Sequence, residues 1–425
     1  VAKNLVGAQR IRSVDKFRLD RAGTASRVQT ARESPPSDFS IDYDQELLRA
    51  IAGAPDGGRP GEVVSGVDVL RVSARTSLSE LAQLLRGYAK AARSRRYRTV
   101  FAGMDQISPV RDADRKTELT DVLLDQLYSG EVENLTIAPP DIVDWTEIRG
   151  FRFGAQSREY PELRIETVIE QFAARGGRAR GALERLRISA IRPDDSTAHA
   201  WPALRCLYAE VSHKGRLYIL NGGAWYSIAA SFIEEVNESM GRVPVVALGL
   251  PDYAHRHEGE YNEAAGRAGR GRLFLLDKKL VHCRAAQGGI ELCDLYSVDR
   301  DLIHVKRAGG SCVYSHWFNQ GVVSAKLLKH DREFRSRASE LLVESGCDGI
   351  PAGELQASEY RIVWAAIGGP KAPTRLPLFS RVTLRLAAQD LQAIGYGVAY
   401  AYIGVSEEHA RRVMVRATSP RRRVA

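Results

Sequence analysis

The chain has 425 residues, enough to bury two or three hydrophobic cores, so we expect two or three domains. Hydrophobic residues make up 44% and charged residues 27%, as in a soluble globular protein. No apolar run approaches the roughly 20 residues that cross a bilayer, which argues against a membrane partner and predicts a cytoplasmic location.

The net charge and the cysteine spacing indicate which partners and structural sites to expect. Lys and Arg number 61 against 52 Asp and Glu, which gives a net charge of +9 and a pI near 9.3. Most basic residues are arginines, whose planar guanidinium groups suit phosphate, so we expect a nucleic-acid partner, with DNA favoured over RNA. A GC-rich genome would also enrich arginine. Five scattered cysteines without CxxC spacing argue against a disulfide framework or a zinc knuckle.

The first 145 residues predict a basic arm and an N-terminal mixed α/β domain. Residues 1–40 mix charges with Ser, Pro and Gly, which indicates a flexible arm that either follows phosphates or is simply solvated. Residues 41–145 alternate between helical and strand patterns, as is typical of an α/β domain. The expected helices cover 43–53, 77–94 and 118–131, and the expected strands cover 67–74, 96–104 and 134–140.

Residues 146–200 are expected to form a basic linker with one helix at 166–176. After this helix, arginines stand beside glycines, a pattern that suits contacts with phosphate but is equally typical of a solvated surface. The candidate nucleic-acid contacts in the linker are Arg175, Arg178 and Arg180.

Residues 201–425 predict the largest domain. Three short antiparallel strands are expected within 204–228, and a helix at 230–241. A short helix, three strands, a helix, a strand, a helix and a last strand follow, which predicts an α/β (α+β) class with helices on a central mixed sheet. These expected elements lie at 257–272, 272–282, 288–310 (a hairpin), 311–330, 360–369, 379–396 and 397–405.

The hairpin at 288–310 carries the residue types that phosphodiester hydrolysis needs. There a divalent cation lowers the pKa of the attacking water, carboxylates hold the cation, and a lysine often orients the water. His304 and Lys306 are two residues apart, so their side chains share one strand face. Asp294 and Glu291 are three apart and face opposite sides of the first strand, so only one of them joins that face. We favour Asp294, and Glu291 stays open.

The remaining roles fall to residues on neighbouring elements. Asp277, on the preceding strand, and Glu260, in the short helix, are candidates for the last metal ligand or the general base. The expected cofactor is a divalent metal, Mg²⁺ or Mn²⁺, although an imidazole ligand such as His304 suits a softer cation than Mg²⁺. Further candidates for contacts with nucleic acid are Lys278, Arg307 and Gln320.

Asp294, His304 and Lys306, with the order of elements after them, resemble the core of the PD-(D/E)xK nuclease superfamily, in particular its Mrr-type restriction endonucleases. There an acid on one hairpin strand precedes an acid or glutamine, one residue and a lysine on the next strand. The resemblance covers 260–405 and implies a restriction-endonuclease-like three-layer domain with metal-dependent cleavage. His304 departs from the superfamily pattern, which puts the metal and the activity in question.

A second resemblance spans almost the whole chain. Five segments look like the hallmarks of a sporadically distributed, uncharacterised bacterial family, and patchy distribution implies a role in genome defence without defining a mechanism. The segments are EGEYN (258–262), LLDKKL (275–280), IELCDL (290–295), IHVKR (303–307) and SHWFNQG (315–321).

The leading hypothesis is a metal-dependent nuclease that cleaves phosphodiester bonds of nucleic acid in bacterial genome defence. The alternative is a catalytically inactive sensor or adaptor that binds nucleic acid in a defence or toxin–antitoxin module. Structural roles also stay open, because Asp294 can cap the hairpin turn and Glu291 can pair with Lys306 across strands. A nucleotidyl-transfer enzyme is disfavoured by the lack of a glycine-rich phosphate loop. A partner protein and a homo-oligomer also remain open.

Overall fold

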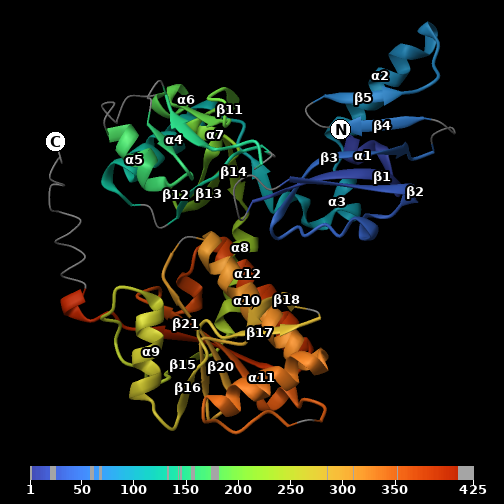
Figure 1. Ribbon diagram of the computed structural model, residues 1–425. Helices are drawn as coiled ribbons and strands as arrows, with labels where there is room; N and C mark the ends of the chain where they lie inside the picture. Colours follow the sequence, from blue (N-terminus) through green and yellow to red (C-terminus); the bar gives the residue numbers. More distant parts are fainter. Residues whose placement is uncertain are drawn as a thin grey trace. The chain divides into compact units, whose positions relative to one another are not determined.

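The computed structural model consists of two compact units, Val1–Ile233 and Glu234–Ala425. Each unit combines helices with sheets (Figure 1), so the predicted mixed α/β class is confirmed. In the part of the chain described, no helix is both long and apolar enough to cross a bilayer. The structure describes residues 2–19, 25–57, 62–66, 69–131, 134–141, 143, 146–154, 158–173, 181–284, 286–309, 311–351 and 353–409.

The first sheet of the N-terminal unit is antiparallel, in the order β2-β1-β3-β4-β5. It corrects two predictions, because residues 1–40 hold two of its strands rather than a flexible arm, and 43–53 lies largely in a strand rather than a helix. Both segments form strands because β1 pairs with β3, and Ile11 and Val14 of β1 are completely buried in the paired sheet. The strands are β1 (Val6–Arg18), β2 (Ala25–Ser34), β3 (Glu46–Pro55), β4 (Val63–Gly66) and β5 (Leu70–Ser73).

Two further antiparallel sheets complete this unit, in the orders β11-β10-β8-β9 and β6-β14-β13-β12-β7. A shared core of leucines and aromatic residues packs against them. The strands are β6 (Ile107–Pro109), β7 (Leu135–Ile137), β8 (Gly150–Phe153), β9 (Glu159–Tyr160), β10 (Arg187–Ile191), β11 (Thr197–Pro202), β12 (Leu207–His213), β13 (Arg216–Asn221) and β14 (Ala224–Ile228).

The helices expected at 77–94, 118–131 and 166–176 form as α2, α4 and α5, whereas the shorter helices of this unit were not predicted. Ser77 with Glu80 begins α2 as a capping box. The strand expected at 96–104 is wrong: that stretch forms helical turns, with the Tyr97 N–H donating to Asn4 Oδ1 at 2.9 Å. The helices are α1 (Ala2–Leu5), η1 (Pro36–Phe39), α2 (Leu78–Arg93), α3 (Tyr97–Val100), η2 (Ala102–Asp105), α4 (Ala113–Ser129), α5 (Ile165–Ala173), α6 (Ala182–Arg185) and α7 (Ala203–Cys206); α8 (Ala230–Gly241) spans the boundary between the units.

The boundary between the units differs from the one expected at residue 201. The three strands expected within 204–228 form as β12, β13 and β14, but they pair with β6 and β7 of the first unit, so the division falls after Ile233. Sequence patterns locate such strands but not their partners, because sheet pairing joins distant segments. The candidate contacts Arg175, Arg178 and Arg180 lie outside the described residues.

The second unit has three layers, with helices on both faces of a six-stranded sheet, as predicted. The sheet order is β15-β22-β21-β20-β19-β16. Strands β15, β22, β21 and β20 are parallel to one another, β19 is antiparallel to β20, and β16 is antiparallel to β19. Helix α9 covers one face, and α10 and α12 cover the other (Figure 1). The elements are β15 (Val245–Val246), α9 (Glu258–Ala268), β16 (Leu273–Leu275), β17 (Leu280–Cys283), β18 (Ala286–Glu291), β19 (Leu295–Ser297), β20 (Asp301–Arg307), α10 (Ser311–His330), α11 (Arg332–Glu344), η3 (Ala357–Glu359), β21 (Arg361–Ile367), η4 (Pro373–Arg375), α12 (Leu378–Ala393) and β22 (Gly397–Ile403).

Two of the expected strands are interrupted, and both interruptions shape the candidate site. The strand expected at 272–282 divides at a turn into β16 and β17, with Lys278 in the left-handed conformation at φ 62°. The first hairpin strand divides at 292–294 into β18 and β19. Because β17 and β18 form a separate two-stranded ribbon, Glu291 belongs to that ribbon, whereas Asp294 precedes a strand of the main sheet.

Candidate functional site

The first turn of α9 is the element around which the candidate site is built. Glu260 accepts hydrogen bonds from the backbone N–H groups of Arg256, at 3.1 Å, and His257, at 3.4 Å, and forms a capping box with His257. These bonds, with that from Arg256 the strongest, lower the pKa of Glu260, which stays exposed. Its carboxylate therefore begins the helix, and the predicted role as a metal ligand is not what the geometry gives it.

Glu258 and Asn262 lie one turn apart and so share a face of α9. The Lys306 ammonium donates to Glu258 Oε2 at 2.8 Å, and the backbone N–H of Arg307 donates to Glu258 Oε1 at 3.0 Å. Both partners of the ion pair are partly exposed, with 34% of the lysine side chain and 29% of the glutamate accessible. Glu258 thus fixes the position of Lys306 at the carboxyl end of β20.

Asp294 lies against the same turn of α9. Its Oδ2 accepts a hydrogen bond of 2.7 Å from the backbone N–H of Val305, and its Oδ1 accepts one of 3.5 Å from the side-chain amide of Asn262. Only 1% of Asn262 is exposed, and its Oδ1 has no hydrogen-bond partner among the described residues. The side-chain amide of Asn262 therefore meets Asp294 through its NH2 group, and its buried oxygen is left without a partner in the described part of the chain.

The turn between β16 and β17 brings Asp277 to this cluster. The N–H of Asp277 donates to the Asp294 carbonyl oxygen at 3.0 Å, and Glu291 Oε1 accepts from the N–H of Lys278 at 2.8 Å, which holds the turn. A Cβ atom at Gly259 of α9 would lie 3.2 Å from Asp277 Oδ2 and 2.7 Å from Lys278 Nζ. Glycine at this helix position therefore permits the close approach of both side chains.

The carboxyl group of Asp294 is both buried and close to the charge of Asp277. Burial raises the pKa of Asp294 to about 8, the N–H of Val305 opposes this, and the charges of Asp277 and Glu291 together with a side-chain hydrogen bond to Asp277 reinforce it. At neutral pH the carboxyl group of Asp294 therefore keeps a proton, since two carboxylates this close are not both charged without a compensating cation.

His304 does not join this cluster, which corrects the predicted grouping with Asp294. It lies on the other face of the sheet, where its Cδ2 is 3.3 Å from the Cβ position of Gly321 in α10, and it pairs in register with Trp364. Burial lowers the pKa of His304 to about 4, so the imidazole is neutral. The expectation failed in part because Asp294 lies in an irregular stretch, where the alternation of a regular strand does not apply. In addition, Lys306 lies next to the end of β20, where its long side chain reaches Glu258 of α9 although alternation puts it on the face of His304.

The candidate nucleic-acid contacts divide between the two faces of the sheet. Lys278 and Arg307 are exposed on the side of α9, with Lys278 Nζ 3.9 Å from Asp277 Oδ2 and the Arg307 guanidinium 5.6 Å from the centre of the Tyr253 ring. Gln320 is exposed on α10, which covers the opposite face. Of these three residues, only Lys278 therefore lies beside the aspartate pair, while Arg307 is tied to α9 through its backbone N–H and Glu258.

The oxygen atoms of this cluster determine which metal ion it could hold. In the described parts of the chain, no group of three or more His, Cys, Asp or Glu residues is arranged to hold a metal ion. The cluster offers two carboxylates, from Asp277 and Asp294, whereas Asn262 directs its NH2 group to Asp294. A small set of hard oxygen donors suits Mg²⁺ or Mn²⁺, which retain waters and substrate oxygens, and does not suit Zn²⁺. The two carboxylates are therefore the donors that would hold such a cation, and the metal itself stays a prediction.

Sequence reasoning missed Glu258, Gly259 and Asn262, which make most of the contacts from α9. The signal was present in EGEYN (258–262), because the first and fifth residues of a helical segment share a face. The choice of Glu260 overlooked its position three residues after the start of the helix, where a glutamate caps.

Segments 258–262, 275–280, 290–295 and 303–307 thus meet at one place in the second unit. A search of curated proteins and a search of solved structures each gave no match to this chain. One family model matches residues 1–404, which include all four segments and both units. The chain belongs to the family of unknown function DUF6119.

Proposed function

We propose that this protein is a metal-dependent nuclease of bacterial genome defence, related to the PD-(D/E)xK superfamily but with an altered set of ligands. The observation that carries the proposal is the meeting of four sequence segments at the first turn of α9, where coupled carboxylates and a positioned lysine lie on neighbouring elements. Hydrolysis of a phosphodiester uses these groups together. The net charge of +9 supports a nucleic-acid substrate, with DNA favoured.

Each residue has a role that follows from its surroundings. Asp277 and Asp294 would hold the divalent cation, and the NH2 group of Asn262 would orient the carboxyl group of Asp294. Mg²⁺ or Mn²⁺ bound there would polarise the phosphate and lower the pKa of a bound water. Asp294 would give up its proton on cation binding, because the cation then compensates the second negative charge.

Lys306 would stabilise the negative charge that develops on the phosphate in the transition state. Glu258 holds its ammonium at 2.8 Å, so the lysine is positioned before substrate arrives. Exposed Lys278 and Arg307 would contact neighbouring phosphates and hold the strand across the site.

A second function, nucleic-acid binding without cleavage in a sensor or adaptor, has an observation of its own. Lys306 is already neutralised by Glu258, and His304, which stands where the superfamily has an acid or an amide, is buried on the other face of the sheet. A site reduced in this way could retain phosphate binding by Lys278 and Arg307 while lacking the full catalytic set.

The test is cleavage of plasmid DNA and of RNA by the full chain with Mg²⁺, with Mn²⁺ and with EDTA. We expect metal-dependent cleavage that falls at least about 100-fold, roughly 2.7 kcal/mol of barrier, in Asp277→Asn, Asp294→Asn and Lys306→Ala. Asp299→Asn and Lys326→Ala change the same residue types elsewhere in the unit and should retain activity.

Cleavage that survives EDTA, or that Asp277→Asn and Asp294→Asn leave intact, would overturn the nuclease proposal. Absence of cleavage by the wild-type chain, together with DNA binding that weakens steeply with salt, would favour the sensor or adaptor instead.

A further inference from the structure

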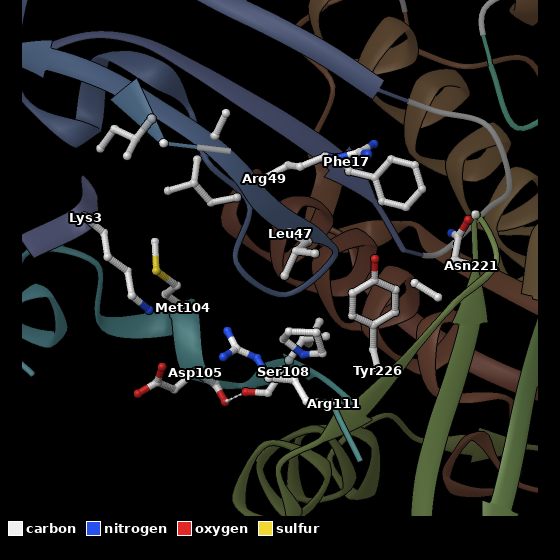
Figure 2. A pocket seen from close by; sticks show the side chains of 18 of the residues that line it. Lys3, Phe17, Leu47, Arg49, Met104, Asp105, Ser108, Arg111, Asn221 and Tyr226 are labelled. Atoms are coloured by element: carbon white, nitrogen blue, oxygen red, sulfur yellow. Dashed lines mark hydrogen bonds between the residues drawn. The ribbon is translucent and has the colours of Figure 1, made fainter. Parts of the chain in front are cut away.

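A cavity of about 600 Å³ opens in the first unit, and none of the residues that line it belongs to the candidate site described above. Strand β3 forms one wall with Leu47 and Arg49, and the segment around η2 and β6 forms another. Figure 2 shows Phe17 and Tyr226 together on one side and Lys3 on the opposite side. Its volume falls within the range of roughly 300–1,000 Å³ that is typical of sites for small molecules.

The acidic side chains in the cavity wall are already compensated. Asp141 accepts hydrogen bonds from Arg205 Nη2 at 3.1 Å and from Trp201 Nε1 at 2.7 Å. Asp105 accepts one from the Tyr97 hydroxyl at 2.5 Å and pairs with Arg98 Nε at 2.6 Å. These two carboxylates are therefore poorly placed to neutralise further cations.

Three cations of the wall remain without such partners. Among the described residues, no hydrogen bond or ion pair engages the charged ends of Lys3, Arg49 or Arg111, and Lys3 Nζ lies 3.3 Å from the centre of the Tyr97 ring. Burial, and then the charges of Arg98 and Arg111, lower the pKa of Lys3, which Asp105 only partly offsets. Like charges held this close repel one another, and an anion bound between them would relieve the repulsion.

We propose that this cavity binds a nucleoside phosphate, with the phosphates at Lys3 and Arg111 and the base against Phe17 and Tyr226. Guanidinium and ammonium groups bind phosphate strongly because each hydrogen bond is charge-assisted. Aromatic side chains stack on any nucleobase. Lys3 lies across the cavity from the aromatic pair (Figure 2), and the cavity is of suitable size, which distinguishes this ligand class from a simple anion.

The test is isothermal titration of the full chain, in EDTA, with ATP, GTP, CTP and UTP, and with adenosine and inorganic pyrophosphate as partial ligands. We expect at least one nucleoside triphosphate to bind more tightly than either partial ligand. Lys3→Glu and Arg111→Glu should each weaken it at least tenfold. The matched control Arg93→Glu reverses an exposed charge on α2 outside the cavity and should bind like the wild type.

Binding should also persist in Asp294→Asn, which separates this site from the proposed nuclease site. The proposal fails if no triphosphate binds at millimolar concentration, if pyrophosphate binds as tightly as the triphosphates, or if Arg93→Glu weakens binding as much as Arg111→Glu does. It also fails if Asp294→Asn abolishes binding.

Discussion

Each face of the sheet in the second unit holds a titratable side chain with a displaced pKa, but the surroundings of the two side chains differ. On the α9 face, Asp294 has a pKa raised to about 8 and contacts Asn262, Asp277 and a backbone N–H group. On the α10 face, His304 has a pKa lowered to about 4, and its Nε2 has no hydrogen-bond partner among the described residues. A displaced pKa reports burial first, and only polar partners with access to solvent make a candidate site.

Strand regularity explains the difference. His304 lies within β20, which pairs in full parallel register with β21, so its side chain is sealed between the sheet and α10. Asp294 lies where the chain leaves one sheet and enters another, so its carboxyl group meets the turn at Asp277 instead of a flat strand. Interruptions of strands are common next to functional sites for this reason.

The largest effect should come from Gly321→Ala, which tests the sealed face. A Cβ atom there would lie 2.8 Å from Trp364 Nε1 and 3.3 Å from His304 Cδ2, so the packing must shift. Overpacking of this kind costs up to about 3 kcal/mol of the free energy of unfolding. Hydrogen exchange of the β20 amides measures the loss.

Gly87→Ala is the matched control, because it also lies within a helix but its Cβ would meet nothing within 4 Å. It should stabilise α2 by up to about 1 kcal/mol. Unchanged protection of β20 in Gly321→Ala would show that the α10 face is loosely packed and would break the comparison between the two faces.

Much of the second unit could be predicted from the sequence, because its long apolar strands and helices carry clear local periodicity. The N-terminal sheet could not, since β1 places Arg10, Arg12 and Lys16 among its apolar residues and resembles a charged arm until β3 pairs with it. Local pattern indicates a strand only where one face is evenly apolar.

The candidate site was predicted in part, through the segments that carry it rather than through its geometry. Asp277, Asp294 and Lys306 were identified, but the pleat rule placed His304 with them because it assumed an unbroken strand. The left-handed turn at Lys278 and the break at 292–294 depend on contacts with α9 and the ribbon, which no local pattern reveals.

The two titratable groups also predict an opposed dependence of stability on pH. Asp294 rises from its ordinary pKa of 3.8 to about 8, so between these values the native state keeps a proton that the unfolded chain has lost, and stability falls with rising pH. His304 falls from 6.5 to about 4, so between these values the unfolded chain holds the extra proton, and stability rises with rising pH.

Below pH 6.5 the contributions of Asp294 and His304 to the free energy of unfolding offset each other. Between pH 6.5 and 8 only the fall in stability due to Asp294 remains. It should amount to about 2 kcal/mol of the free energy of unfolding at the limiting slope. Hydrogen exchange of the β20 amides at both pH values measures it. Asp294→Asn should remove most of the fall and Asp299→Asn should not; an equal slope in both variants would contradict the raised pKa of Asp294.

The smallest effect should come from Gly259→Ala, which tests the open face. A Cβ atom there would displace the Lys278 ammonium, now 2.7 Å away, and crowd Asp277 Oδ2 at 3.2 Å, but both are ends of side chains that can move. We therefore expect protection of β20 to stay within about 1 kcal/mol of the wild type, because alanine also favours the helix. Metal-dependent cleavage, in contrast, should fall about tenfold, roughly 1.4 kcal/mol of barrier, since the aspartate pair loses its geometry.

Gly266→Ala is the matched control on the same helix, because its Cβ would meet Leu275 at an ordinary 3.4 Å. It should leave cleavage unchanged. Equal cleavage by Gly259→Ala and Gly266→Ala would mean that the close approach of α9 to Asp277 and Lys278 has a structural role and none in cleavage. If Gly259→Ala loses cleavage while the fold is retained, the α9 face tolerates a small shift in structure but its chemistry does not. On the α10 face around His304, by contrast, the same kind of substitution should cost stability.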